Sequence, residues 1–154
     1  YFAMVTPCMI NDQNPLYFVN DVFNGIFVHG NVLDDAMFYG RGAGKLPTAS
    51  AVVADVVDAV KNLGTNVPVI WDEDKYELGS FGDFENKFFV RMKDKGLDDN
   101  QMMDILSTFG DVLYVKAPNV KDELAFITNP IKESVFEEGI KKFDDVYSVI
   151  RVDF

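Results

Sequence analysis

The sequence of 154 residues is poor in cysteine and histidine, with a single residue of each. One cysteine, Cys8, cannot form an internal disulfide, and its presence is compatible with the reducing cytosol. Cys8 lies in an apolar stretch, so we expect its thiol in the core. His29 lies at the end of a predicted strand, where a surface position is more typical than a catalytic role.

Positive charge is also scarce. The chain has 14 lysines and arginines against 25 aspartates and glutamates, which gives a formal net charge of -11. Only Arg41, Arg91 and Arg151 are arginines. A nucleic-acid-binding protein needs a basic face, and an anionic membrane surface attracts basic segments. This composition therefore argues against both kinds of partner.

The sequence has no long hydrophobic run. No apolar stretch approaches the ~20 residues that span a bilayer, and no basic segment precedes an apolar one as in a secretory signal. We therefore expect a cytoplasmic protein without a membrane partner. The chain opens on the apolar residues YFAMVTP, from which we expect a piece of something longer.

The chain has ample material for a core, because 48% of its residues are hydrophobic and 25% are charged, as in ordinary globular domains. Its composition changes along the chain and predicts a first domain over residues 1–64, a linker over 65–84 and a second domain over 85–154. The linker carries the acidic run Asp72-Glu73-Asp74. Three consecutive acids in a loop are usually solvated, so we predict no metal site there. We expect Trp71 to cover a seam between the linker and a domain.

The first domain is predicted as strands followed by a helix. An apolar strand at about Phe2–Ile10 precedes a polar turn, and Val22–His29 and Ala36–Tyr39 form a hairpin through Gly30-Asn31. The helix ends at Asn62-Leu63-Gly64, where glycine suits a left-handed cap. Its apolar residues repeat at helical spacing along one stripe, namely Ala49, Val52, Val53, Val56, Val57 and Val60.

Between this hairpin and this helix, the segment MFYGRGAGKLP has glycine at positions 40, 42 and 44. A strand, a glycine turn and a helix N-terminus together present backbone N–H groups to an anion such as a nucleotide phosphate. The segment is not a Walker loop, because Tyr39 stands where glycine is required and Leu46 where serine or threonine is required. Its glycine spacing also differs from the Rossmann fingerprint. On the motif alone, a structural turn and a cofactor contact are both open.

The second domain is predicted to have the βαββαβ order of ferredoxin-like domains, which makes the chain an α+β protein. In Asn86–Lys93, alternate residues point to opposite faces of a sheet. Asp98 and Gln101 resemble a capping box at the start of the first helix. Asn129-Pro130 is expected to open the second helix. The other strands are predicted at Val112–Lys116, Leu124–Thr128 and Val146–Phe154.

Residues 14–60 carry the pieces by which a family can be identified: Pro-Leu at the entry of a strand, then FYGRGAG, then PTASAVV. In this order they resemble the end of the catalytic region of homoserine dehydrogenase. The resemblance implies that residues 1–64 are the C-terminal portion of the catalytic sheet with its return helix, and that the second domain is an ACT regulatory domain. It covers only the C-terminal part of the enzyme.

The resemblance also implies a function in threonine and methionine biosynthesis. The parent enzyme, an oxidoreductase, would interconvert L-homoserine and aspartate semialdehyde with NAD or NADP. Gly42, Ala43 and Gly44 match the glycine loop that lies against the cofactor, and no catalytic residue is assigned to this chain. We therefore expect the chain alone to be inactive, to hold no cofactor by itself, and to form a homodimer or a larger homo-oligomer.

ACT domains resemble one another at the turn after their first strand, typically Asp-x-Pro-Gly, where an amino-acid effector binds. Here the turn reads Asp94-Lys95-Gly96-Leu97, so proline is lost and Leu97 occupies the usual glycine position. The effector implied by the family is threonine, and a Cβ at Leu97 would crowd it. We expect allosteric binding at Asp94, Gly96 and Leu97 to be weak or lost. The alternative function is a free-standing amino-acid-sensing or assembly module without catalysis.

Overall fold

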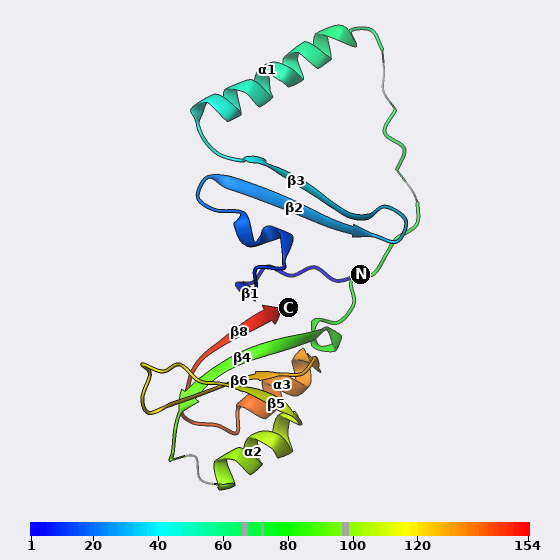
Figure 1. The fold of residues 1–154 in the computed structure, drawn as a ribbon. Helices are drawn as coiled ribbons and strands as arrows, with labels where there is room; N and C mark the ends of the chain where they lie inside the picture. Colours follow the sequence, from blue (N-terminus) through cyan, green and yellow to red (C-terminus); the bar gives the residue numbers. More distant parts are fainter. Residues whose placement is uncertain (66–67, 72, 97–98) are drawn as a thin grey trace. The chain divides into compact units, whose positions relative to one another are not determined.

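A computed structural model describes residues 1–65, 68–71, 73–96 and 99–154 (Figure 1). Its internal contacts divide the chain into two units. One unit contains Tyr1–Ile10 together with Tyr76–Phe154, and the other contains Asn11–Lys75. The first ten residues therefore pack with the C-terminal half of the chain, although 65 residues of the other unit separate the two pieces in sequence.

The C-terminal unit is built on one mixed sheet covered by helices. The strand order is β1-β8-β4-β6-β5, with β1 parallel to β8 and the other pairs antiparallel. From β4 to β8 the elements follow the predicted βαββαβ order, with one short extra strand, β7. The elements are β1 (Cys8–Ile10), η2 (Phe81–Asp83), β4 (Glu85–Lys93), α2 (Asp99–Phe109), β5 (Val112–Val115), β6 (Glu123–Thr128), β7 (Ile131–Lys132), α3 (Glu133–Ile140) and β8 (Val146–Asp153).

The core of this unit lies between the sheet and its two helices. Phe88, Val90 and Met92 of β4 are buried, as the alternation of this strand predicted. Both helices cover the same face of the sheet, because α2 and α3 contribute residues to the one cluster that contains these side chains. The rings of Phe88 and Phe136 stack with their centroids 3.7 Å apart. The cluster comprises Phe88, Val90, Met92, Ile105, Phe109, Leu124, Phe126 and Phe136.

The start of α3 differs from the prediction that Asn129-Pro130 opens this helix. The helix begins at Glu133, and Ile131–Lys132 form the strand β7, which pairs with Asn86 and Glu85 of β4. The backbone N–H of Glu133 then donates to Phe84 O at 2.9 Å. Pairing with β4 satisfies backbone groups that a longer helix would have used, and it delays the helix by three residues.

The second unit contains a two-stranded antiparallel sheet and one helix. The elements are η1 (Pro15–Phe18), β2 (Phe23–Gly30), β3 (Asp34–Arg41) and α1 (Lys45–Lys61). The hairpin is as predicted, but β2 is shifted by one residue, β3 is longer than expected, and Gly30 pairs with Asp34. Asp34 has a φ of 63°, in the left-handed region that aspartate tolerates better than most residues. The loop between the paired residues has three residues, 31–33, and the left-handed Asp34 follows it as the first residue of β3.

Helix α1 has the predicted extent, and Gly64 beyond its end has a φ of 78°. None of its residues is buried. The valines of its predicted stripe are between 45% and 60% exposed, namely Val52, Val53, Val56, Val57 and Val60. The stripe is therefore a helix face without a covering partner in the part of the chain that the structure describes.

Three expectations about single elements are wrong. The strand expected over Phe2–Ile10 is confined to Cys8–Ile10. Cys8 is exposed and not in the core, because β1 is the edge strand of its sheet and has a neighbour on one side only. Trp71 is 85% exposed and covers no seam, since residues 68–71 belong to no regular element that could pack against it. None of the helices in the described part of the chain combines the length and the hydrophobicity of a membrane-spanning segment.

Candidate functional site

The glycine loop consists of Gly42, Ala43 and Gly44 and connects β3 to α1. All three residues are exposed. Gly44 is the N-cap of α1, with φ 121° and ψ 152°, a combination that is essentially restricted to glycine. The N–H of Thr48 donates to Gly44 O at 3.1 Å and closes the first turn of the helix. The predicted junction of strand, glycine loop and helix N-terminus is therefore present.

The N-terminus of α1 can accept an anion. No side chain hydrogen-bonds the N-cap, and the first turn carries no acidic residue. The first backbone N–H groups of a helix lack partners within the helix, and the helix dipole favours negative charge at this end. Arg41 and Lys45 flank the loop and add positive charge in a chain that is otherwise acidic. The surroundings of the loop thus suit a phosphate or another anionic group.

Gly42 lies against the neighbouring strand β2. A Cβ added at Gly42 would overlap the side-chain amide of Asn24. Asn24 is paired across the hairpin with Gly40, where a Cβ would meet nothing within 4 Å. Close packing therefore requires glycine at position 42, and the backbone angles require it at position 44. Neither reason applies to Gly40.

The turn between β4 and α2 contains Asp94 and Gly96, two of the residues predicted to bind an effector. Leu97, the third, lies outside the described residues, as does Asp98 of the predicted capping box. The N–H of Gly96 donates to Asp94 Oδ1 at 2.8 Å, and Gly96 has a φ of 99°. Gly96 therefore adopts the left-handed conformation within this turn. It lies one position before the glycine of the Asp-x-Pro-Gly turn that is typical of ACT domains.

Gln101 closes this turn from inside the unit. Its side chain is buried, its Oε1 accepts from the N–H of Lys95 at 3.0 Å, and its Nε2 donates to Lys93 O at 3.0 Å. The amide thus bonds to backbone groups on the strand side of the turn. Sequence reasoning assigned Gln101 to a capping box, whereas this contact joins α2 to the end of β4.

A cavity of about 770 Å³ lies beside the turn, at the end of the sheet where β5 and β6 are joined. Arg91 and Asp94 of the strand side, Met102 of α2 and Tyr114 of β5 are among its lining residues. The Tyr114 hydroxyl is buried without a hydrogen-bond partner among the described residues, and burial raises the pKa of this phenol. Local patterns do not signal this cavity, because its lining residues come from four segments that meet only in the folded unit.

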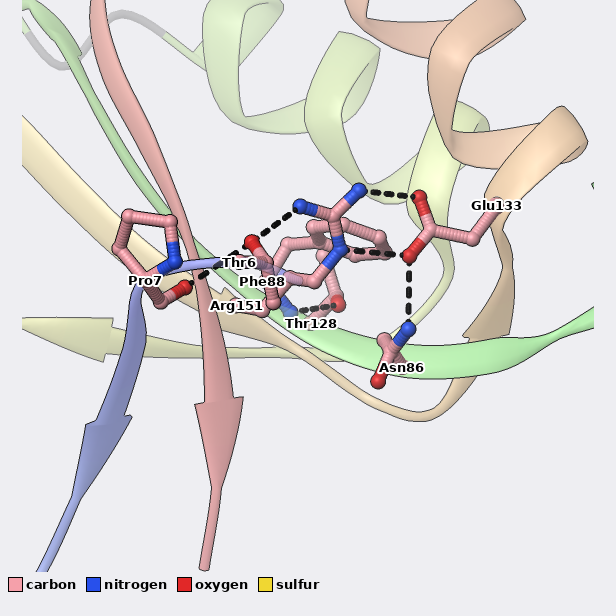
Figure 2. A network of polar contacts seen from close by, with 7 residues as sticks. All are labelled: Thr6, Pro7, Asn86, Phe88, Thr128, Glu133 and Arg151. Carbon is pink, nitrogen blue, oxygen red and sulfur yellow. Dashed lines mark hydrogen bonds and ion pairs between the residues drawn. The ribbon is translucent and has the colours of Figure 1, made fainter. Parts of the chain in front are cut away.

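A buried ion pair, separate from the lining of this cavity, joins α3 to β8 in the same unit (Figure 2). Glu133, at the start of α3, is only 1% exposed. Arg151 donates to its two oxygens through Nε at 2.7 Å and through Nη2 at 2.8 Å. Asn86 Nδ2 donates to Glu133 Oε1 at 2.6 Å. The hydrogen bond to Glu133 raises the pKa of Arg151, so this guanidinium stays charged.

Arg151 also reaches the N-terminal segment. Its Nη1 donates to Thr6 Oγ1 at 2.8 Å (Figure 2). The guanidinium carbon lies 5.6 Å from the centroid of the Phe81 ring and 5.7 Å from that of Phe88, within cation–π distance. Sequence reasoning missed this network, because a lone arginine on a predicted strand does not reveal its partners.

One group of side chains has metal-ligand chemistry. His29, Asp34 and Asp35 at the tip of the β2–β3 hairpin each offer a ligand atom, and these atoms lie within 4.8 Å of one another. All three residues are exposed, and His29 Nδ1 lies 2.6 Å from Asp35 Oδ1. The acidic run in the predicted linker does not belong to this group, and Asp72 lies outside the described residues.

Comparison with known proteins gives a consistent result. Residues 1–57 match the homoserine dehydrogenase family. Homoserine dehydrogenase of Bacillus subtilis (strain 168) is 28% identical over 159 residues, which cover 96% of this chain and 37% of that protein. Homoserine dehydrogenase of Mycobacterium tuberculosis (strain ATCC 25618 / H37Rv) is 31% identical over 173 residues, which cover 98% of this chain and 38% of that protein.

The solved structures agree with the sequence comparison. The crystal structure of S. aureus homoserine dehydrogenase at pH 6.0 matches with a TM-score of 0.68 and 28% identity, over 96% of this chain and 36% of that chain. This chain thus spans little more than a third of the length of the proteins it matches. The predicted resemblance is confirmed: the chain is homologous to part of homoserine dehydrogenase, consistent with a C-terminal segment of that enzyme.

Proposed function

We propose that this chain is the part of an NAD(P)-dependent homoserine dehydrogenase that closes over the cofactor, supports dimerisation and carries a regulatory domain. The parent enzyme would interconvert L-homoserine and aspartate semialdehyde in the cytoplasm, for threonine and methionine biosynthesis. The observation that carries the proposal is the exposed glycine loop at the N-terminus of α1, inside the residues that match the family.

The glycine loop fits a dinucleotide cofactor. Gly42, Ala43 and Gly44 are exposed, and the N–H groups at the start of α1 lack a side-chain cap. The absence of a Cβ at Gly44 lets another molecule approach the backbone closely. When bound, the nicotinamide supplies hydride transfer. The loop residues of this chain hold the cofactor, and the catalytic groups belong to the portion of the enzyme that this chain does not cover.

The exposed valine face of α1 supports the proposal of a larger assembly. Burying a valine side chain fully contributes about 1.5–3 kcal/mol, so a stripe of valines favours a covering partner. We propose that the dinucleotide-binding domain of the intact enzyme covers it. In the isolated chain, association with a second copy through the stripe or through sheet edges takes the place of that domain.

The βαββαβ part of the C-terminal unit is proposed to be an ACT-type regulatory domain in which binding of threonine, the effector implied by the family, is weak or lost. Its element order and its own core support this assignment. The effector site would include Asp94, Gly96 and Leu97. The alternative function is a free-standing amino-acid-sensing module without catalysis, and the cavity beside this turn supports it.

A chimera tests the proposed function. In it, this chain replaces the matching portion of the Bacillus subtilis relative, and we expect NAD(P)-dependent oxidation of homoserine. In the chimera, Gly44→Ala should raise the KM for the cofactor about tenfold or more, because the loop can no longer adopt the backbone of Gly44. Gly40→Ala is the matched control and should leave turnover unchanged, since a Cβ at Gly40 meets nothing within 4 Å.

The isolated chain provides the second arm. It should show no turnover with homoserine and either cofactor, and measurable turnover would contradict the proposal. A chimera that folds, as judged by circular dichroism, yet lacks activity would favour the sensing module. In that case calorimetry should detect an amino acid bound to the isolated chain.

A further inference from the structure

The first ten residues contact the C-terminal unit at several points, although Val5 between these points is fully exposed. The N–H of Gly79 donates to Tyr1 O at 2.8 Å, and the rings of Phe2 and Phe84 lie 5.3 Å apart between centroids. Further along, β1 pairs with β8 in parallel, with Cys8 opposite Arg151. The last three residues of the segment therefore form an edge strand of the sheet whose other strands build the βαββαβ domain.

Arg151 is the polar anchor of this segment. Glu133 takes two of its donors in a bidentate pair, and the remaining terminal nitrogen, Nη1, donates to Thr6 (Figure 2). The carboxylate itself is held by α3 and by Asn86 of β4. A bidentate pair fixes the plane of the guanidinium. Thr6 therefore accepts its bond from a donor that helix α3 and strand β4 hold in place.

After Ile10 the chain enters the other unit and supports the hairpin there. The N–H of Asn14 donates to Asn11 O at 3.1 Å, and Asn14 Oδ1 caps η1 by accepting from the N–H of Leu16 at 3.0 Å. Leu16 and Val19 then pack on Gly25 of β2, where an added Cβ would come within about 3 Å of both side chains. The side chains at this end of the segment thus pack closely against β2.

Strand β2 connects this support to the glycine loop. Asn24 precedes Gly25 on β2, and its side chain lies against Gly42. Residues 1–19, here called the N-terminal strap, therefore have one end fixed to the βαββαβ domain. The other end packs on Gly25, next to Asn24, whose side chain lies against Gly42 of the glycine loop. The connection between the two ends is the covalent chain itself.

We propose that the N-terminal strap couples the βαββαβ domain to the glycine loop. Loosening β1 from β8 frees the segment that orders η1, and loosening η1 removes the support of β2 beside Asn24 and Gly42. Local opening of this kind spreads through contiguous contacts. Its consequence for a dehydrogenase rests on the proposed function, whereas the coupling itself does not.

Hydrogen–deuterium exchange of the whole chain tests the coupling without any activity. Thr6→Val removes the acceptor of the Arg151 bond and keeps the shape of the side chain. A hydrogen bond to a charged group is worth enough that its loss should speed exchange in β1 roughly 10- to 100-fold. We expect faster exchange in η1 as well, and in the hydrogen-bonded amides of α1 from Thr48 onward, because the amides that precede Thr48 in the helix lack partners within it. Thr6→Ser keeps the hydroxyl and should match the unsubstituted chain.

A second variant tests the coupling from the other end of the strap, at η1. Asn14→Ala removes the cap of η1, and because coupling is reciprocal it should speed exchange in β1 as well as in η1. Faster exchange confined to β1 in Thr6→Val, or to η1 in Asn14→Ala, would overturn the proposal. So would unchanged exchange in β1 of Thr6→Val. If Thr6→Val unfolds the core strands β4 and β6, Asn14→Ala decides alone. The chimera assay can fail while this coupling holds, so the two proposals are tested separately.

Discussion

Gly42 and Gly44 of the glycine loop are required for different physical reasons. Gly44 has backbone angles that side-chain-bearing residues avoid, whereas Gly42 makes room for the Asn24 side chain. Asn24 ends in a flexible amide that can move aside, but the backbone angles of Gly44 have no such outlet. We therefore rank Gly44 as the more sensitive position of the loop.

Replacing Gly44 by alanine should destabilise the start of α1. A residue with a Cβ at φ 121° and ψ 152° costs about 1–3 kcal/mol. Hydrogen–deuterium exchange of the amides of α1 measures this cost as faster opening of the helix. Gly40→Ala is the control, because Gly40 has no positive φ and open space for a Cβ. Equal exchange in both variants would show that the backbone of Gly44 is not strained by alanine.

The ion pair of Glu133 and Arg151 dominates the polar interior of the C-terminal unit. The carboxylate is buried at the first turn of a helix, where the dipole favours its charge. Buried pairs add little net stability compared with an apolar pair, but removal of one partner leaves the other charge uncompensated.

Glu133→Gln should therefore lower the free energy of unfolding of this unit by about 3 kcal/mol. We choose the lower end of the usual range because the Arg151 side chain remains 24% exposed and can recover some hydration. Urea unfolding followed by circular dichroism measures the change. Glu138→Gln on the exposed side of the same helix should stay within about 0.5 kcal/mol of the unsubstituted chain. A loss as large in the control would contradict a specific role for the pair.

At the scale of elements, the turn between β4 and α2 is already occupied by its own hydrogen bonds. Asp94 accepts from Gly96, and Gln101 takes the backbone groups of Lys93 and Lys95. An effector carboxylate would compete with these contacts and with the negative charge of Asp94. This geometry is consistent with the expectation, drawn from the residues of the turn, that threonine binds weakly.

Calorimetric titration of threonine into the chain tests that expectation. We expect no binding in the micromolar range. Micromolar affinity that Leu97→Arg abolishes would instead identify the turn as a working effector site. Leu113→Arg, on an exposed position of β5, is the matched control, since it adds the same charge away from the turn.

At the scale of the whole molecule, both units expose large apolar side chains that lie close together on one element. The valines of α1 form one such surface, and Ile26 and Phe38 on the hairpin are each about two-thirds exposed. Surfaces of this kind are covered by other domains or by other copies of the chain. We therefore expect the isolated chain to associate with other copies of itself.

Light scattering at high micromolar concentration should show a dimer or a larger assembly. The double substitution Val53→Asp with Val56→Asp places charge on the valine face of α1 and should reduce the assembly. The double substitution Val69→Asp with Ile70→Asp is the control, because it adds the same charge at two residues that are at least as exposed but lie outside the helix. A monodisperse monomer of the unsubstituted chain would refute the prediction of association.

Several elements were predictable from the sequence because local patterns suffice to specify them. The alternation in β4 follows from the two-residue period of a strand, and the core indeed contains Phe88, Val90 and Met92. The extent of α1 follows from its helical repeat and its flanking glycines. The family resemblance rested on residues 14–60, most of which lie within the matched residues 1–57.

Only the tertiary structure decided how distant segments combine. Arg151 and Thr6 are 145 residues apart, and Arg151 and Glu133 are 18 residues apart, so no local period relates them. The same is true of β1, whose three residues become a strand only by pairing with β8, and of β7, which delays α3 by pairing with β4. Local patterns report which face of an element is apolar, whereas the choice of partner depends on contacts that form after the chain has folded.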